Sequence, residues 1–296
     1  MSLVETVVAY GIYSAALVAI GAVGFTLQFG MTNVLNLSYG AVLTSAIFVH
    51  HAVMHGNVAI GPAVAVGAAW GAAFSWLIGR YVVAAYARRG TSRFGMAMVT
   101  IALGLVIQYT LEGIQGPTIL SYTVAHARQF RLGAVVLSDL QLVIVGSAVV
   151  VMLGVHVLLR HTRIGLAMRA VADDAGLSEG CGVDAATVRT VAWLVSGALC
   201  GICGVFLGLS TGSFDASSGG GLFVTVVAAA VLGGIGKPYG AMVGALVVGL
   251  AGETAAALLS PAYKDVLAWC LLLVVLALRP QGIFAQYVHR GQLVRQ

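Results

Sequence analysis

Charged residues are scarce in this chain. Asp, Glu, Lys and Arg together make up 8% of its 296 residues, against roughly 25% in a soluble domain. Hydrophobic residues make up 60%, and the mean hydropathy is +1.00. Water would solvate such a surface poorly, whereas lipid would solvate it well. The scarcity therefore excludes an ordinary soluble fold and predicts a protein surrounded by a bilayer.

Proline and cysteine are also rare, with 5 and 4 residues, whereas glycine is abundant at 39. Few prolines and many small residues are typical of membrane helices whose backbones approach closely. Three of the cysteines, Cys200, Cys203 and Cys270, lie in apolar runs, and the fourth is Cys181. This distribution argues against a disulfide framework.

Several motifs are missing. There is no G-x-x-x-x-G-K-[ST] phosphate loop, so the chain is not an ATPase of that kind. Its acids are few and scattered and no nucleophile motif stands out, so we expect no enzyme, no cofactor and no bound metal. The net charge is +5, but the charges are too sparse for a nucleic-acid-binding face. The opening MSLVETVVAY lacks the basic region of a signal peptide, so we expect the first apolar run to be retained.

Nine apolar runs follow one another, separated by charges, Asn, Pro and Gly. They cover about 6–29, 34–54, 58–85, 94–112, 138–159, 190–210, 221–236, 240–258 and 266–279. None alternates in the way that a barrel strand would. The pattern predicts an all-α, polytopic bundle of eight or nine transmembrane segments, forming a single domain over residues 1–296.

The positive charges predict the orientation. If all nine segments cross, twelve Lys and Arg residues lie on one side and three on the other. The richer side holds Arg80, Arg88, Arg89, Arg93, Arg160, Arg163, Arg169, Arg189, Lys237, Arg279, Arg290 and Arg295, and the poorer side holds Arg128, Arg131 and Lys264. Positive charge favours the cytoplasm. We therefore expect a multi-pass protein of the inner membrane with a cytoplasmic C-terminus and an external N-terminus.

Two polar stretches interrupt the apolar pattern: NVLNLSYG at 33–40 and TGSFDASSGGG at 211–221. Polar or unwound backbone at membrane depth is tolerated only against protein or a watery cavity, and paired breaks often mark a transport site. If one of these segments is re-entrant, eight spans remain and the N-terminus changes sides.

The longest polar loop, 160–189, holds eight of the 25 charges. Ile164, Ala167, Met168 and Val171 recur at helical spacing and predict a short amphipathic helix. A second short helix is predicted from Asp173 and Asp174 to the Gly-Cys-Gly at 180–182, after which Asp184 can cap the next helix. Arg163, Arg169 and Asp173 lie outside the apolar stripe of the first helix. A helix resting on the membrane and a helix docking on a partner both fit this pattern.

The loop TRIGLAMRAVADD at 162–174, followed by GVD at 182–184, resembles the cytoplasmic motif of branched-chain amino acid ABC transporter permeases, and most closely the LivH-like branch. Three more patches resemble that family in the same order. They are GFTL at 24–27 with NVLNLSYG at 33–40, AVLGGIG at 230–236 with PYGA at 238–241, and YKD at 263–265 with RPQGIF at 279–284. The NLSYG at 36–40 departs from the family's commoner N-F-A-H-G, which leaves the substrate open.

The resemblance implies a non-enzymatic pore subunit of an importer for branched-chain amino acids, amides or urea. It also implies a second permease subunit, cytoplasmic ATPase subunits and a periplasmic solute-binding protein. The expected coupling loop is 160–189, with the ATPase contact on Arg163, Gly165, Ala167, Arg169, Ala170, Asp173 and Asp174. For the substrate path we name Asn33, Asn36, Ser38 and Tyr39 from the first break and Asp215, Ser217 and Ser218 from the second, together with Glu253.

Two other classes of function remain open. Glu253 interrupts an apolar run, and an ionisable group at membrane depth would suit a secondary transporter, unless the residue lies near the outer end of its helix. Cys200-Gly-Ile-Cys203 has the spacing of a thiol oxidoreductase motif, although its apolar surroundings favour helix packing.

Two weaker patterns lie on the outer side. His51 and His55 are one helical turn apart, beside His50, but no carboxylate or thiolate completes a metal site there. The loop 113–137 contains the alternating stretch FRLGAVVL, which fits either a short strand or a simple surface connection.

Overall fold

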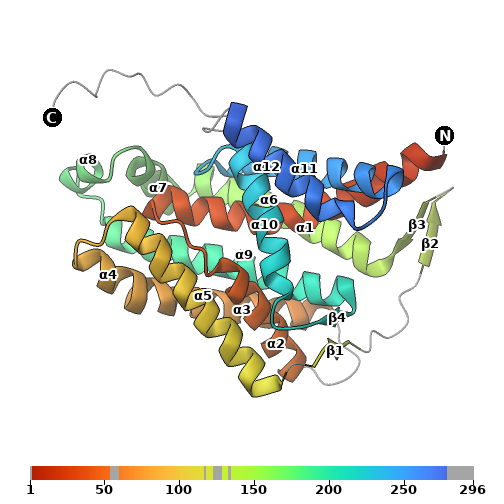
Figure 1. Cartoon of the computed structure of the whole chain (residues 1–296). Coiled ribbons are helices and arrows are strands. Elements are labelled where there is room, and N and C mark those ends of the chain that lie inside the picture. The colour runs from red at the N-terminus through yellow and green to blue at the C-terminus, as the bar shows by residue number, and fades with distance from the viewer. Residues whose placement is uncertain (1, 54–59, 117, 123–128, 133–134, 279–296) are drawn as a thin grey trace.

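The computed structural model describes residues 2–53, 60–116, 118–122, 129–132 and 135–278. In this part of the chain, helices predominate (Figure 1). The helices are α1 (Ser2–Thr32), α2 (Tyr39–Val53), α3 (Ile60–Leu77), the π-helix η1 (Ile78–Val83), α4 (Ala84–Arg88), α5 (Arg93–Gln115), α6 (Asp139–His161), α7 (Arg163–Asp173), α8 (Ala175–Gly180), α9 (Ala185–Thr211), α10 (Ser218–Gly233), α11 (Pro238–Leu258) and α12 (Tyr263–Leu278). The strands are β1 (Leu120–Ser121), β2 (Gln129–Leu132), β3 (Val135–Ser138) and β4 (Ser213–Phe214).

The apolar helices confirm the predicted polytopic bundle. Among the described residues, six helical segments are long and apolar enough to cross a membrane: Val4–Thr32, Gly61–Arg88, Arg93–Gln115, Asp139–His161, Ala185–Thr211 and Pro238–Leu258. Three shorter apolar helices, Tyr39–Val53, Ser218–Gly233 and Val266–Ala277, match the remaining apolar runs. The second span is continuous through α3, η1 and α4, because the π-helix joins the two α-helices without a break.

Glycines bring the central helices into backbone contact. A Cβ added to Gly71 of α3 would lie 2.8 Å from the Cα of Gly201 in α9, and one added to Gly201 would meet the carbonyl of Gly67. Gly233 of α10 and Gly240 of α11 meet in the same way. Such close approach increases van der Waals contact between helices that share an apolar surrounding. As a result α1 and α9 are largely enclosed, whereas α5 and α6 keep most of their surface on the outside.

The two polar breaks meet inside the bundle. After Thr32 the chain folds back, and α2 begins at Tyr39, which has no exposed surface. The Thr44 hydroxyl of α2 accepts a hydrogen bond of 3.1 Å from the backbone N–H of Gly219, at the start of α10. A Cβ on Gly219 would also meet the carbonyl of Gly40. Both short helices, α2 and α10, therefore begin beside each other within the protein.

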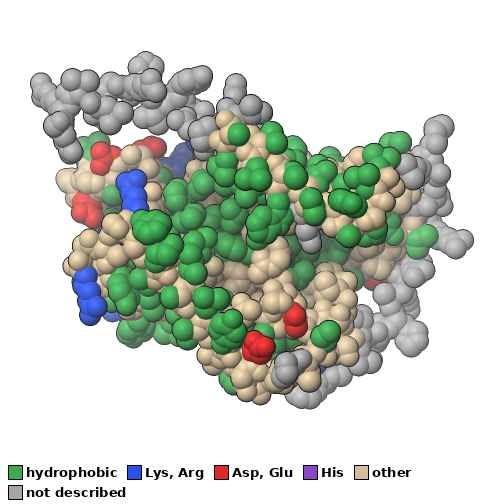
Figure 2. Space-filling model, in the orientation of Figure 1, with side chains coloured by type: hydrophobic (Ala, Val, Ile, Leu, Met, Phe, Trp, Pro, Cys, Tyr) green, Lys and Arg blue, Asp and Glu red, His purple; other side chains and the backbone are tan. Residues whose placement is uncertain are grey.

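The two ends of the bundle differ. Helices α4, α7 and α8 lie at one end, and the start of α1 lies at the other with the four short strands (Figure 1). Where one short strand was predicted, the structure has two, and β2 pairs antiparallel with β3. The Tyr10 hydroxyl of α1 donates to the carbonyl of Val136 in β3 over 3.0 Å. Figure 2 shows Lys and Arg side chains gathered over the α4 and α8 end, whereas the middle of that face is mainly hydrophobic.

Candidate functional site

A buried hydrogen-bond network holds the first polar break. The Asn36 side chain accepts from the Ser38 hydroxyl over 2.6 Å and from the Ser38 backbone N–H over 3.2 Å. Its amide donates to Oε1 of Gln28 over 3.3 Å, and the Ser196 hydroxyl donates to the same oxygen over 3.2 Å. These side chains are 2% exposed or less. Helices α1 and α9 are thus tied to the unwound break through short polar side chains.

Backbone groups of the break find partners on other helices. The Thr100 hydroxyl of α5 accepts from the backbone N–H of Leu37 over 3.2 Å and bonds the carbonyl of Leu35 over 3.1 Å. The Tyr39 hydroxyl donates to the carbonyl of Gly21 over 3.1 Å. Unpaired backbone groups are costly away from water, so these bonds allow the chain to remain unwound at this depth. Asn33 is exposed at the end of α1, with a φ of 52°.

A cavity of about 420 Å³ lies in the half of the bundle nearer the strands, between α1, α9, α10, α11 and α12. Its size suits a small solute. The polar side chains along its wall are Tyr13, Ser14, Ser210, Thr211, Ser218, Thr225 and Lys264, and the aliphatic ones are Leu17, Val18, Leu207, Leu222 and Val248. Of the predicted path residues, Ser218 lines this cavity, whereas Asn36, Ser38 and Tyr39 lie buried in the network beside α2.

Glu253 lies beside the same cavity. Its carboxylate forms an ion pair with the ammonium group of Lys264, which lines the cavity from α12. The Glu253 side chain is 17% exposed and that of Lys264 is 39% exposed. Tyr13 and Ser210 line the same cavity. The structure therefore places a positive and a negative group together at a cavity that also offers hydroxyls and aliphatic side chains.

Asp215 organises the turn before α10. Its carboxylate accepts from the hydroxyls of Ser217, at 3.0 Å, and Ser218, at 2.7 Å, and from the Ser217 backbone N–H at 3.1 Å. The hydrogen bond from Ser218 is the main cause that holds the Asp215 pKa below its usual value. Asp215 and Ser217 do not line the cavity, but they position Ser218, which does.

The loop 160–189 contains the two predicted helices. Thr162 caps α7 by accepting from the Gly165 backbone N–H over 2.9 Å, and Asp174 caps α8 by accepting from the Leu177 N–H over 2.9 Å. Asp184 caps α9 as predicted, and its bonds to Thr187 are the main cause that lowers its pKa. The three caps begin three helices in close succession.

One side of α7 packs against α6, and the other is exposed. A Cβ on Gly165 would meet the carbonyl of Leu158 and the backbone of Leu159. Met168 and Val171 are also buried, as predicted, but the expected apolar position Ile164 is 42% exposed. The inward stripe therefore runs through Gly165, because only a glycine fits so close to α6. Leu166 is 62% exposed on the outer side, and Arg163, Arg169, Asp173 and Asp174 are exposed too, whereas Ala167 and Ala170 are half-buried.

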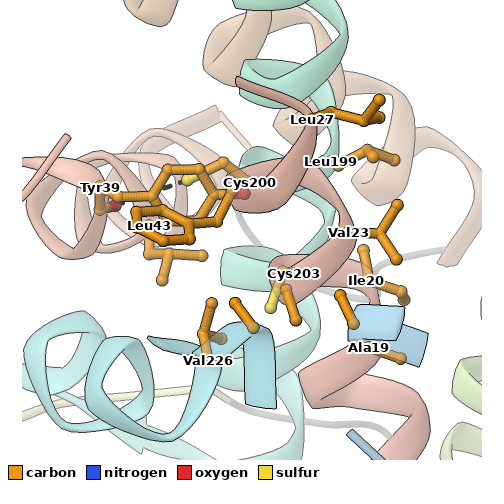
Figure 3. Close-up of a cluster of buried hydrophobic side chains, with 14 of the residues drawn as sticks. Ala19, Ile20, Val23, Leu27, Tyr39, Leu43, Leu199, Cys200, Cys203 and Val226 are labelled. Atoms are coloured by element: carbon orange, nitrogen blue, oxygen red, sulfur yellow. Dashed lines mark hydrogen bonds between the residues drawn. The ribbon is translucent and has the colours of Figure 1, made fainter. Parts of the chain in front are cut away.

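The Cys200 and Cys203 thiols are free and have no exposed surface. They lie among aliphatic side chains and Tyr39 in the centre of the bundle (Figure 3). Cys200 donates to the carbonyl of Tyr39 over 3.5 Å and Cys203 to that of Leu17 over 3.4 Å. A thiol relay needs access for its partner, so this position favours the packing interpretation.

His50 and His51 belong to an aromatic cluster with Tyr122 and Phe214. Nδ1 of His50 lies 2.8 Å from the Tyr122 hydroxyl, and the His51 ring packs edge-on against Tyr122 and Phe214. No three His, Cys, Asp or Glu side chains gather anywhere among the described residues. His55 lies outside those residues.

The family comparison agrees with this architecture. A sequence model described as "Branched-chain amino acid transport system / permease component" matches residues 7–276, which is most of the chain. The chain belongs to this permease family.

Relatives of this permease cover nearly its whole length. It is 28% identical to the high-affinity branched-chain amino acid transport system permease protein LivH of Escherichia coli K12, over 93% of this chain and 94% of that protein. It is 28% identical to BraD of Pseudomonas aeruginosa, a permease protein of a system with the same description, over 90% and 91%. The ribose import permease protein RbsC of Escherichia coli is 26% identical over 78% and 72%. No solved structure matches significantly.

Several polar residues that shape the permease interior were not predicted from the sequence. Gln28, Thr44, Thr100 and Ser196 are each 1% exposed or less and join the breaks to neighbouring helices. Each is a polar residue within an apolar run, which is the signal that could have identified them. Lys264 was assigned only to the outer side, and its partner Glu253 is 11 residues away in sequence.

Proposed function

We propose that this permease is the membrane-spanning subunit of an ATP-binding cassette importer that takes up branched-chain amino acids or related small polar solutes such as amides or urea. Partner subunits hydrolyse the ATP, and this chain itself catalyses no reaction. The observation that carries the proposal is the position of α7, which lies at the basic end of the bundle with one side fixed to α6 and the other exposed. Membership of the permease family supports the same conclusion.

The exposed side of α7 suits a protein contact. Leu166 offers an apolar anchor, and Arg169 offers a charge on the same short helix. Interfaces typically combine such an apolar centre with a polar rim. Because Gly165 contacts α6 through its backbone, a shift of α7 would move α6 as well. ATP-driven closure of the partner would then bias the bundle between its inward and outward states.

We assign the substrate path to the cavity beside Glu253 and Lys264. A zwitterionic amino acid carries one charge of each sign; Lys264 and several hydroxyls line the cavity, and the Glu253 carboxylate lies next to Lys264. The aliphatic wall suits a branched side chain. Ser218 lines this cavity at the start of α10. It is hydrogen-bonded to Asp215, which also binds Ser217. The predicted path residues of the first break would affect the path through the shape of the break, because three of them are buried within the chain: Asn36, Ser38 and Tyr39. The fourth of these residues is Asn33.

The remaining partners follow from the same arrangement. A periplasmic binding protein would deliver substrate at the end that holds the strands, and a second permease subunit would cover apolar helix faces such as those of α5 and α6. The basic end would face the cytoplasm of a cell with an inner membrane, and the distribution of Lys and Arg predicts the C-terminus on the same side of the membrane. A secondary transporter would need an ionisable relay within the membrane, and Glu253 with its partner Lys264 is a thin basis for one.

The test uses the exposed side of α7, because substitution of Gly165 would break the packing on α6. Leu166→Glu and Arg169→Glu are each expressed together with the ATPase and binding-protein subunits of the importer, and Leu177→Glu on α8 serves as the control. We expect co-purification of the ATPase and uptake of leucine to fall at least tenfold in both α7 variants. Undiminished co-purification and uptake would refute the docking assignment.

The same cells test the substrate. Wild-type uptake is measured with leucine, isoleucine, valine, acetamide and urea. Saturable, ATP-dependent uptake of one of these classes identifies the cargo. If Lys264→Gln and Ser218→Ala leave the KM for that cargo unchanged, the cavity is not on its path.

A further inference from the structure

A second cavity of about 720 Å³ opens at the basic end of the bundle, away from the proposed substrate path. It lies between the end of α1, the span formed by α3, η1 and α4, and the beginning of α9. Three arginines line it, Arg80, Arg88 and Arg189, and no carboxylate does. Its floor includes the indole of Trp193, which is 4% exposed, and Val83 and Ala84 lie along the wall.

Two of these arginines have no acidic partner among the described residues. Arg189 forms a loose ion pair with Glu179, at 3.8 Å, whereas Arg80 and Arg88 form none. The nearest other acid along α9, Asp184, directs its carboxylate to the N–H groups of Ala186 and Thr187. The cavity therefore has an excess of positive charge that the described part of the chain does not neutralise.

The π-helix places both unpaired arginines in the same cavity. The backbone N–H of Ala84 bonds the carbonyl of Gly79, five residues earlier. In a regular α-helix, two residues eight apart point about 80° away from each other, and the extra residue of a π-turn reduces this to about 20°. Gly79 allows the turn to lie on Trp193, because a Cβ there would come within 2.6 Å of the indole ring.

The depth of Arg80 argues for a lipid. It lies inside the apolar span Gly61–Arg88, roughly 12 Å along the helix from Arg88. A soluble partner docking on the helix ends would reach Arg88 more readily than Arg80, and an arginine facing hydrocarbon is costly. A lipid phosphate satisfies a guanidinium with two hydrogen bonds at that depth. Trp76 and the 64% exposed Tyr81 beside the cavity are residue types enriched at the level of the headgroups.

We propose that this cavity binds the phosphate headgroup of an anionic phospholipid. Arg80 and Arg88 contact the phosphate, and Trp193 and Val83 contact the start of the acyl chains. The site would select anionic over zwitterionic lipid and would hold α3 against α9 at this end of the bundle.

The test compares lipid binding by the purified full-length chain in detergent. Dioleoyl phosphatidylglycerol and dioleoyl phosphatidylcholine are titrated separately, and native mass spectrometry reports the bound fraction. We expect the wild-type chain to bind the anionic lipid more tightly. Arg80→Gln and Arg88→Gln should each weaken that binding roughly tenfold and leave phosphatidylcholine unaffected.

Arg89→Gln is the matched control, because Arg89 neighbours Arg88 but lies over the Tyr86 ring instead of in the cavity. Arg80→Lys with Arg88→Lys keeps the charge and should keep most of the selectivity, which separates loss of the site from loss of the fold. Equal binding by the Gln variants and the wild type would refute the proposal. An equal loss in Arg89→Gln, or full displacement of the lipid by inorganic phosphate, would also refute it. The proposal would also be refuted if the Gln variants bound lipid normally but no longer co-purified with the ATPase, because the cavity would then be a protein contact.

Discussion

Gly71 shows how a single residue can determine the distance between two helices. The carbonyl of Gly197 and the backbone of Gly201 occupy the space that a side chain at Gly71 would need. Gly113, in contrast, has no atom within 4 Å of an added Cβ and lies on the exposed α5. The two glycines are in apolar helices of similar length, so their different surroundings allow a matched comparison.

We expect Gly71→Val to destabilise the protein by about 3 kcal/mol or more, because the clash involves backbone atoms that cannot rotate away. Gly113→Val should change the free energy of unfolding by less than about 0.5 kcal/mol. The measurement is denaturant unfolding of the purified proteins in the same detergent. Equal stability of the two variants would show that α3 and α9 do not pack through glycine.

The unwound stretch between α1 and α2 depends on polar side chains from other helices. Asn36 satisfies Ser38 twice and donates to Gln28, so its removal leaves buried polar groups without partners. Thr110 is a suitable control, since its hydroxyl bonds only the carbonyl of Val106 on the exposed α5.

We expect Asn36→Leu to lower the free energy of unfolding by about 1–3 kcal/mol, the usual cost of unsatisfied buried groups. Thr110→Val should stay within about 0.5 kcal/mol of the wild type. Thermal unfolding in detergent, with uptake measured in parallel, checks both values. A neutral Asn36→Leu would mean that the other contacts of the break, such as those of Thr100 and Tyr39, hold it without this network.

The elements that the sequence predicted well are those with a local signal. Asp184 comes directly before α9 and caps it as predicted, and the apolar runs correspond to the spans. The contact between the two breaks was not predictable, because Thr44 and Gly219 are 175 residues apart and each is ordinary in its own segment. Ile164 was placed on the wrong side of α7, since hydrophobicity gives no sign that a glycine makes the closest contact.

At the scale of the whole molecule, the reactivity of cysteines can show which end of the bundle faces the cytoplasm. Cys181 follows α8 and is exposed, and Ser121 in β1 is exposed at the opposite end of the bundle. Cys200 and Cys203 are buried and should not react. The exposed Cys270 is replaced by serine in every variant.

In intact spheroplasts, a membrane-impermeant maleimide should label Ser121→Cys in a Cys181→Ser background but should not label the native Cys181. Cys181 should react only after the membrane is opened. Labelling is read from a gel shift of the purified protein. The reverse pattern would place α7 and α8 outside and contradict the predicted topology.

The contact of Gly165 with α6 has a mechanical consequence. No flexible side chain lies between α7 and the backbone of Leu158 and Leu159, so little of a push on α7 can be absorbed at that corner. Helix α6 then runs for 23 residues, roughly 35 Å, to the β2–β3 hairpin, which Tyr10 fastens to α1. Helix α6 therefore couples the two ends of the bundle mechanically, and a displacement at one end is transmitted to the other within a single helix.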